Sequence, residues 1–146
     1  MKCREVMTKD PACCVPGDTV DKAAQLMKTE DVGPIPVVEN QQTKKLVGII
    51  TDRDLALKIV ADGRDAKSTK VEAVMTRDPV TCRADDDLQQ ALDTMAQYQV
   101  RRIPIVDNQN QLLGIIAQAD VATRSGKGKK TADVVEEISK SSATGK

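Results

Sequence analysis

Apolar residues follow two different spacings along the chain, and the changes of spacing predict the elements. After Asp18 they recur at the 3.6-residue spacing of an amphipathic helix, and Asp18 is the expected N-cap. The apolar face of this helix consists of Val20, Ala23, Ala24 and Met27. Before the helix, residues 12–15 predict a short strand that follows a turn at residues 10–11.

Two short runs rich in β-branched residues come next, IPVV at 35–38 and LVGIIT at 46–51. The polar stretch between them predicts a hairpin. From Asp52 to about Ala61 the helical spacing returns, and it stops before Gly63. The predicted order of elements is therefore strand, helix, strand, strand, helix.

This order of elements occurs twice. VMTKDPACC at 6–14 aligns with VMTRDPVTC at 74–82, and the IPVV run aligns with IPIV at 103–106. After a small deletion in the second copy, LVGII at 46–50 aligns with LLGII at 112–116. Matched runs in the same order indicate duplication of a folding unit. The apolar helix face of the second copy consists of Leu88, Ala91, Leu92 and Met95.

Each copy has a small sheet to cover, and packing two copies together buries apolar surface of both. We therefore expect an α+β fold in which two halves share one core with approximate twofold symmetry. The expected paired domain spans 1–125, with repeat one at about 6–62, a polar linker at about 63–73 and repeat two at about 74–125. Residues 126–146 are expected to form a basic linker and then a short helix or a flexible tail.

Charge and composition argue against several classes of function. Lys and Arg together number 22, as do Asp and Glu, so no net charge attracts nucleic acid or an anionic membrane. The chain has no His, which is the usual general base and the commonest zinc ligand. It also has no Trp or Phe to stack on single-stranded nucleic acid. We therefore expect neither an enzyme nor a nucleic-acid-binding protein.

Cysteine usage and hydropathy bear on the compartment. The cysteines, Cys3, Cys13, Cys14 and Cys82, show no C-x-x-C spacing. No apolar run approaches the length of a signal sequence or a membrane span. These features predict a cytoplasmic protein with reduced thiols and without a metal site.

Two related runs carry the candidate chemistry, GIITDRD at 48–54 and GIIAQAD at 114–120. Together with VMTKDP, VGPIPVV, VMTRDP and VRRIPIV, they make residues 6 to about 124 resemble the CBS (cystathionine beta-synthase) domain family, in the paired arrangement called a Bateman module. The resemblance implies two β-α-β-β-α repeats whose clefts bind adenine nucleotides or related adenosyl ligands. It also implies regulation of an associated protein.

The resemblance further implies roles for individual residues. The family's ligand motif is a glycine, two apolar residues, Thr or Ser, two variable residues and Asp, and Gly48, Thr51 and Asp54 satisfy it. Asp54 would accept hydrogen bonds from the ribose hydroxyls, and Thr51 would donate one to a phosphate. The predicted ligand-binding set is Cys13, Val32, Pro34, Ile35, Pro36, Thr51, Asp54, Thr81, Arg102, Ile103, Pro104 and Asp120, with Thr51, Arg53 and Arg101 as phosphate candidates. The arginines are chosen for their charge, and the alternative for each is a solvated surface residue.

Helix capping explains the central residues without any ligand, because TDRD at 51–54 is also a capping box. In the second copy Ala117 replaces the threonine, whereas Asp120 is retained. The retained carboxylate favours a ribose contact slightly, although an acidic residue also stabilises the first turn of a helix. The second copy departs from the family motif, and Arg102 stands where the first copy has Pro34, so the two sites are chemically unequal.

The function we predict is a regulatory sensor that binds AMP, ADP or ATP and signals through a homodimer or an unknown effector protein. We expect no catalytic cofactor, no nucleic-acid partner, no membrane partner and no output domain. The alternative is a structural or protein-interaction module with degenerate clefts, for which Ala117 is the best evidence. Whether Mg²⁺ accompanies a triphosphate is open, and Asp52 is the carboxylate that we name for it.

Overall fold

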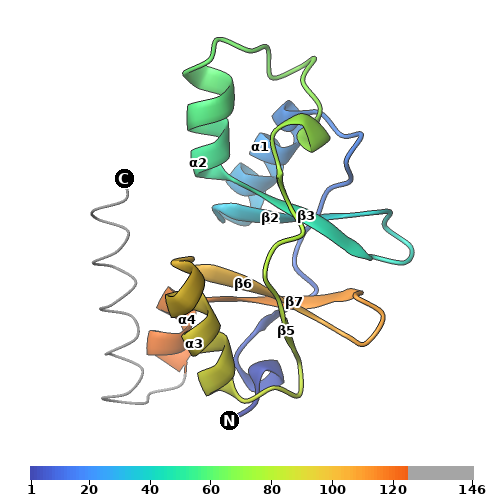
Figure 1. Ribbon diagram of the computed structural model, residues 1–146. Helices are drawn as coiled ribbons and strands as arrows, with labels where there is room; N and C mark the ends of the chain where they lie inside the picture. Colours follow the sequence, from blue (N-terminus) through green and yellow to red (C-terminus); the bar gives the residue numbers. More distant parts are fainter. Residues whose placement is uncertain (125–146) are drawn as a thin grey trace. The chain divides into compact units, whose positions relative to one another are not determined.

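The computed structural model describes residues 1–124, which divide between two compact units (Figure 1). Unit 1 contains Met1–Asp10, Val80–Asn108 and the chain from Leu113 onward. Unit 2 contains Pro11–Pro79 and Gln109–Leu112. The segment at 126–146, expected to be a basic linker and a short helix or tail, lies outside the described residues.

Unit 2 is a three-stranded antiparallel sheet with helices from the first sequence copy. Its strand order is β2-β3-β4. Cys14 adds an isolated parallel bridge to Val37, on the side of β2 away from β3. The elements of unit 2 are α1 (Val20–Glu30), β2 (Pro34–Val38), β3 (Leu46–Thr51), α2 (Asp52–Asp54), the π-helical segment η2 (Leu55–Val60), the 3₁₀ turn η3 (Val71–Ala73) and β4 (Thr76–Arg77).

Unit 1 repeats this plan with a four-stranded sheet. Its strand order is β1-β7-β6-β5, with β5 parallel to β6 and β1 antiparallel to β7. The elements of unit 1 are η1 (Cys3–Glu5), β1 (Thr8–Lys9), β5 (Cys82–Arg83), α3 (Leu88–Tyr98), β6 (Arg102–Val106), β7 (Leu112–Ala117), whose first residue is counted with unit 2, and α4 (Gln118–Arg124). The parallel pair Cys82↔Ile105 corresponds to the Cys14↔Val37 bridge of unit 2.

The two copies exchange their opening segments. Strand β1, from the start of the first copy, pairs with β7 of the second, with Thr8 opposite Ile115. Strand β4, from the start of the second copy, pairs with β3 of the first, with Thr76 opposite Ile49. The compact units are therefore offset from the sequence repeats, and each sheet contains a strand from both copies.

Most of the buried apolar residues in the described part of the chain form two clusters, one in each unit. The cluster of unit 2 includes Val20, Ile35 and Ile50, and that of unit 1 includes Leu92 and Ile116. We expected one core shared by both halves, and within each unit the clustered buried residues form an interior of their own. The exchanged strands give the physical reason, because each sheet, completed by a strand from the other copy, has its own helices and its own cluster of buried side chains.

The predicted helices and hairpin are confirmed, with three local corrections. The strand expected at residues 12–15 is reduced to the bridge at Cys14. The N-cap of α1 is Thr19 rather than Asp18. The Asp18 carboxylate instead accepts the Val15 N–H at 3.0 Å and forms an ion pair with Lys22 at 3.3 Å. Asp18 therefore stabilises the turn before the helix. The helix expected from residue 52 to about 61 becomes π-helical after its first turn.

Candidate functional site

Thr51 lies where β3 ends and the helical segment begins. Its backbone is extended, with φ −122° and ψ 164°, and the next three residues form α2. In the β2–β3 register, Thr51 stands opposite Pro34. The Asp52 N–H donates to the carbonyl of Gly33 at 3.0 Å, which continues the pairing for one more residue. The strand-to-helix junction is therefore held directly beside the start of the PIPVV strand.

Thr51 and Asp54 form the reciprocal capping box that their spacing predicts. The Thr51 Oγ1 accepts the Asp54 N–H at 3.2 Å, and the Asp54 Oδ2 accepts the Thr51 N–H at 2.9 Å. These contacts use one acceptor position of the hydroxyl and one of the carboxylate. A hydroxyl also has a proton to donate, and a carboxylate has about four acceptor positions. Capping therefore leaves both groups able to bind a ligand.

Lys58 is a functional candidate that lies outside the sequence motifs. Its Nζ lies 3.2 Å from the Asp54 Oδ1 and donates to the carbonyl of Val74 at 2.9 Å. The i,i+4 spacing of Asp54 and Lys58 is the signal in the sequence that points to this ion pair. The Asp54 side chain is only 15% exposed, so this carboxylate is held by two donors in a partly enclosed position.

Cys13 lies on the other side of β2 from Thr51. The neighbouring Cys14 N–H donates to the Pro36 carbonyl at 3.1 Å, and the Cys14 carbonyl accepts the Val38 N–H at 2.9 Å. The Cys13 thiol is partly exposed and donates to the Gln41 Oε1 at 3.3 Å. Unit 2 therefore contains Cys13, next to the bridge that Cys14 makes with β2, together with the Thr51–Asp54 pair at the end of β3.

Burial divides the remaining predicted residues of the first copy. Ile35 is fully buried in the core, so its side chain has no exposed surface for a base and only its backbone is available. Pro36 is also buried, whereas Pro34 is partly exposed. Val32 is 41% exposed and is the apolar side chain of this region that a ligand can cover. Arg53 is exposed, with its charge at the helix surface.

The second copy has the same backbone frame with different side chains. The Gln118 N–H donates to the Arg101 carbonyl at 2.9 Å, as Asp52 does to Gly33 in the first copy. Ala117 provides no hydroxyl at the position of Thr51. Gln118 is buried, and its Oε1 has no hydrogen-bond partner among the described residues. Asp120, on α4, is partly exposed.

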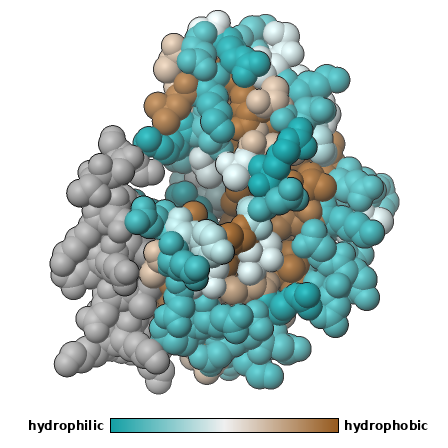
Figure 2. Space-filling model, viewed as in Figure 1, coloured by the Kyte–Doolittle hydropathy of each residue, from teal (hydrophilic) through white to brown (hydrophobic). Residues whose placement is uncertain are grey.

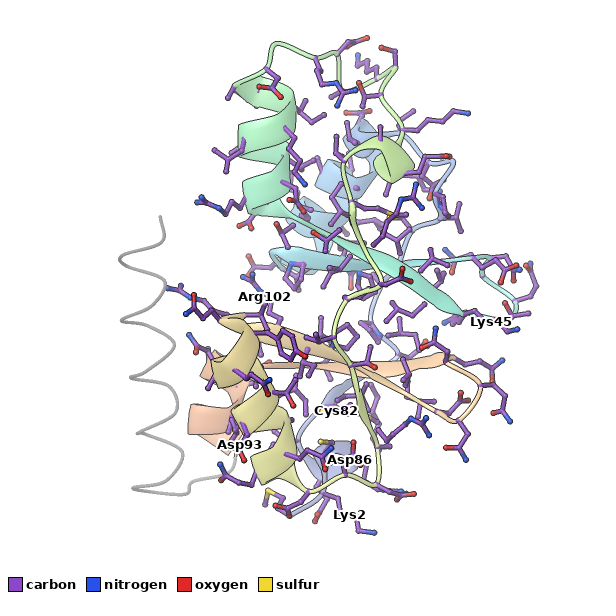
Figure 3. All side chains as sticks on the ribbon, in the orientation of Figure 1. Lys2, Lys45, Cys82, Asp86, Asp93 and Arg102 are labelled. Atoms are coloured by element: carbon purple, nitrogen blue, oxygen red, sulfur yellow. The ribbon has the colours of Figure 1, made fainter. Side chains whose placement is uncertain are left out.

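The other predicted residues of the second copy lie along β5 and β6. Arg102, labelled in Figure 3, is the first residue of β6 and is partly buried, whereas Arg101 is exposed. Ile103 is fully buried and Pro104 is also buried, so both belong to the interior of unit 1. Thr81 is partly exposed and directly precedes β5, which pairs with β6.

The glycine of each G-I-I run is required by strand packing. A Cβ at Gly48 would lie 2.7 Å from the Met75 Sδ and 2.8 Å from the Thr76 carbonyl oxygen. A Cβ at Gly114 would lie 2.7 Å from both the Met7 Sδ and the Thr8 carbonyl oxygen. The resemblance attributes Gly48 to a ligand motif, but its place in the sheet explains it through the close approach of the exchanged strand.

The cysteines are free thiols, and three of them are buried. Burial raises the pKa of the Cys3 and Cys14 thiols to about 12, and it also raises the pKa of the Cys82 thiol. Protonated thiols of this kind are poor nucleophiles and poor metal ligands. Within residues 1–124, no group of three or more His, Cys, Asp or Glu residues is placed to hold a metal ion.

The CBS domain profile matches residues 3–61 and 71–126 of this chain. The chain belongs to the CBS domain family. The CBS domain-containing protein YhcV of Bacillus subtilis is 41% identical over 136 residues, which cover 93% of this chain and 94% of that protein. The family assignment confirms the α+β fold with two CBS repeats.

Two solved CBS structures with ligands resemble this chain. The CBS domain pair of protein MJ0100, in complex with 5′-methylthioadenosine and S-adenosyl-L-methionine, matches with a TM-score of 0.77 and 26% identity over 88% of this chain and 98% of that one. CBSX2 in complex with AMP matches with a TM-score of 0.71 and 26% identity over 85% of this chain and 95% of that one. Ligands that contain adenosine therefore occur among the structural relatives of this CBS chain.

Proposed function

We propose that this chain is a regulatory module that binds an adenine nucleotide, AMP, ADP or ATP, through its first CBS copy. The observation that carries the proposal is the Thr51–Asp54 pair at the end of β3. Its capping contacts are made at 2.9 and 3.2 Å, and they leave a hydroxyl proton and carboxylate acceptor positions for a ligand.

The chemistry of this pair suits a nucleoside phosphate. The Asp54 carboxylate accepts hydrogen bonds from the two hydroxyls of a ribose, and the Thr51 hydroxyl donates to a phosphate oxygen. Backbone groups at the start of β2 recognise the polar edge of adenine, and the exposed Val32 covers its face. AMP in CBSX2 and the adenosyl ligands of MJ0100 support this class of ligand.

The second copy is proposed to bind differently. Ala117 offers no hydroxyl to a phosphate, whereas Asp120 remains for a ribose. The guanidinium groups of Arg101 and Arg102 are the phosphate candidates that remain there. The second copy therefore favours an adenosyl ligand with weaker phosphate contact, and the first copy is the site at which variants are most informative.

Signalling is proposed to pass through a homodimer or an effector protein. Leu57 is 48% exposed and Val60 is 77% exposed, and both lie on η2 directly after Asp54. Figure 2 shows apolar residues at several places on a largely hydrophilic face. Exposed apolar side chains next to a ligand site allow occupancy of the site to alter binding to a second copy or to an effector protein.

No helix within residues 1–124 has the length and apolarity needed to cross a lipid bilayer.

The second candidate function is a structural or protein-interaction module without a ligand. Ala117 favours it, and so does the complete capping box, which explains Thr51 and Asp54 through helix stability alone. The two candidates differ in one observable property. A ligand-binding module is stabilised by its nucleotide, whereas an interaction module is not.

The experiment is a thermal melt of ligand-free protein with AMP, ADP, ATP or S-adenosylmethionine. A ligand at about 100 times its dissociation constant adds about 2.7 kcal/mol to the free energy of unfolding. Asp54→Asn is the test variant, because an amide oxygen still accepts the Thr51 N–H while the charge is removed. We expect stabilisation of the wild-type protein that is lost in Asp54→Asn, and no stabilisation by any of the four compounds would reject the proposal.

A further inference from the structure

Lys58 connects the Asp54 carboxylate to the Val74 carbonyl, which is remote from it in the sequence. Its Nζ lies 3.2 Å from the Asp54 Oδ1 and 2.9 Å from the Val74 carbonyl oxygen. We propose that Lys58 positions the Asp54 carboxylate for ribose recognition, an inference that rests on the proposed function. We also propose that Lys58 couples ligand binding at Asp54 to the segment at 74–78.

The contacts of Asp54 fix the orientation of its carboxylate. The Thr51 N–H donates to Oδ2 at 2.9 Å, and the Lys58 ammonium forms an ion pair with Oδ1 at 3.2 Å. Two donors on two different oxygens remove the rotation that a single contact would allow. The remaining acceptor positions then point in one fixed direction, which lowers the entropic cost of binding a pair of ribose hydroxyls.

Lys58 lies in a stretch of unusual helical geometry. It belongs to the π-helical segment Leu55–Val60, in which the Ala61 N–H donates to the Ala56 carbonyl at 2.9 Å. Single π-helical turns within helices are frequent at functional sites. The spacing also recurs in the second copy, because Lys58 follows Gly48 at the same distance as Arg124 follows Gly114. Both copies therefore have a cation at this position.

The second acceptor of Lys58 lies in a structured segment. Val74 is buried and is the C-cap residue after η3, and its N–H donates to the Val71 carbonyl at 3.0 Å. Directly after it, β4 pairs with β3, and the Asp78 N–H donates to the Val47 carbonyl at 3.2 Å. Loss of the contact between Lys58 and the Val74 carbonyl is therefore expected to loosen β4, the strand that the second copy contributes to this sheet.

The test compares AMP with 2′,3′-dideoxy-AMP, which lacks both ribose hydroxyls. Calorimetric titrations are made with the wild-type protein, Lys58→Met and Lys58→Arg, and with Lys28→Met as the control at an exposed lysine on α1. We expect the wild-type protein and Lys28→Met to prefer AMP about tenfold or more, because hydrogen bonds to a charged group are lost in the analogue. In Lys58→Met this preference is expected to fall to about threefold or less, and Lys58→Arg is expected to restore it.

An unchanged preference in Lys58→Met would overturn the positioning role while leaving the proposed function intact. Hydrogen–deuterium exchange of the ligand-free proteins measures the link to the segment at 74–78 independently. Exchange there is expected to be about fivefold faster in Lys58→Met than in the wild-type protein or Lys28→Met. Unchanged exchange in Lys58→Met would overturn the link to the segment at 74–78. If the wild-type protein binds neither AMP nor the dideoxy analogue, the proposed function itself fails.

Discussion

Replacing Gly48 by alanine tests the close approach of β4 to β3. The added Cβ would lie 2.8 Å from the Thr76 carbonyl oxygen and 2.7 Å from the Met75 Sδ. The methionine end can rotate away, although Met75 is only 7% exposed. The carbonyl belongs to the backbone of β4, which pairs with β3 through Ile49↔Thr76, so it cannot move without disturbing that pairing.

The expected cost follows from these contacts. Forcing an extra methyl group into a packed interior costs about 1–3 kcal/mol, and a clash with backbone places Gly48→Ala at about 2 kcal/mol or more. Gly17→Ala is the matched control, because a Cβ there meets no heavy atom within 4 Å. It is expected to change the free energy of unfolding by less than about 0.5 kcal/mol.

Urea denaturation followed by far-ultraviolet circular dichroism measures both variants, since the chain has no tryptophan for fluorescence. Gly114→Ala meets the Met7 Sδ and the Thr8 carbonyl oxygen at 2.7 Å and is expected to behave like Gly48→Ala. A Gly48→Ala protein as stable as the Gly17→Ala control would refute the packing explanation. The glycine would then have to be explained by ligand binding instead.

Three further predictions follow from the capping box and the cysteines. Thr51→Ala removes the hydroxyl that accepts the Asp54 N–H and is expected to cost about 1 kcal/mol in urea denaturation without ligand, whereas equal loss in Thr51→Ser would contradict the capping role. Burial raises the pKa of the Cys3 and Cys14 thiols from 9.0 to about 12, so the folded protein keeps them protonated at a pH where the unfolded chain loses the protons. The free energy of unfolding therefore has its full contribution from these thiols below pH 9.0 and loses it as the pH rises toward 12. Urea midpoints across that window should fall, and flat midpoints would contradict the burial of these thiols. Maleimide should label the partly exposed Cys13 before the three buried cysteines, and a fast phase that persists in Cys13→Ser would show that another thiol is accessible.

The local structure was largely predictable from the sequence, because local patterns determine it. The helix faces around Ala23 and Met95 are buried as their spacing predicts. The hairpin of β2 and β3 forms around its polar turn. The Thr51–Asp54 capping box needs only residues three positions apart, so its geometry follows from the local sequence.

The exchange of opening strands could not be predicted in this way. Both openings contain the same Met-Thr pair, and both G-I-I runs offer a glycine to pack against. Hydrophobic pattern alone is therefore satisfied by either pairing, and tertiary packing decides between them. The separate clusters of the two units follow from the same exchange, because each sheet is completed by a strand of the other copy.

The candidate site was predictable only in part. Thr51 and Asp54 are brought together, but the side chain of Ile35 belongs to the core and not to a ligand surface. The contact between Lys58 and the Val74 carbonyl joins a side chain to a backbone atom that is remote in the sequence, so no motif reports it. The buried Gln118 Oε1, which has no hydrogen-bond partner among residues 1–124, likewise depends on packing that the sequence does not show.

We propose above all that the first CBS copy binds an adenine nucleotide through Asp54. Calorimetric titration of AMP into ligand-free wild-type protein, Asp54→Asn and Asp120→Asn tests it most directly. We predict saturable binding by the wild-type protein, a loss of about tenfold or more in affinity for Asp54→Asn, and retained binding by the first copy in Asp120→Asn. Equal affinity of wild-type protein and Asp54→Asn, with Asp54→Asn shown to be folded, would contradict it.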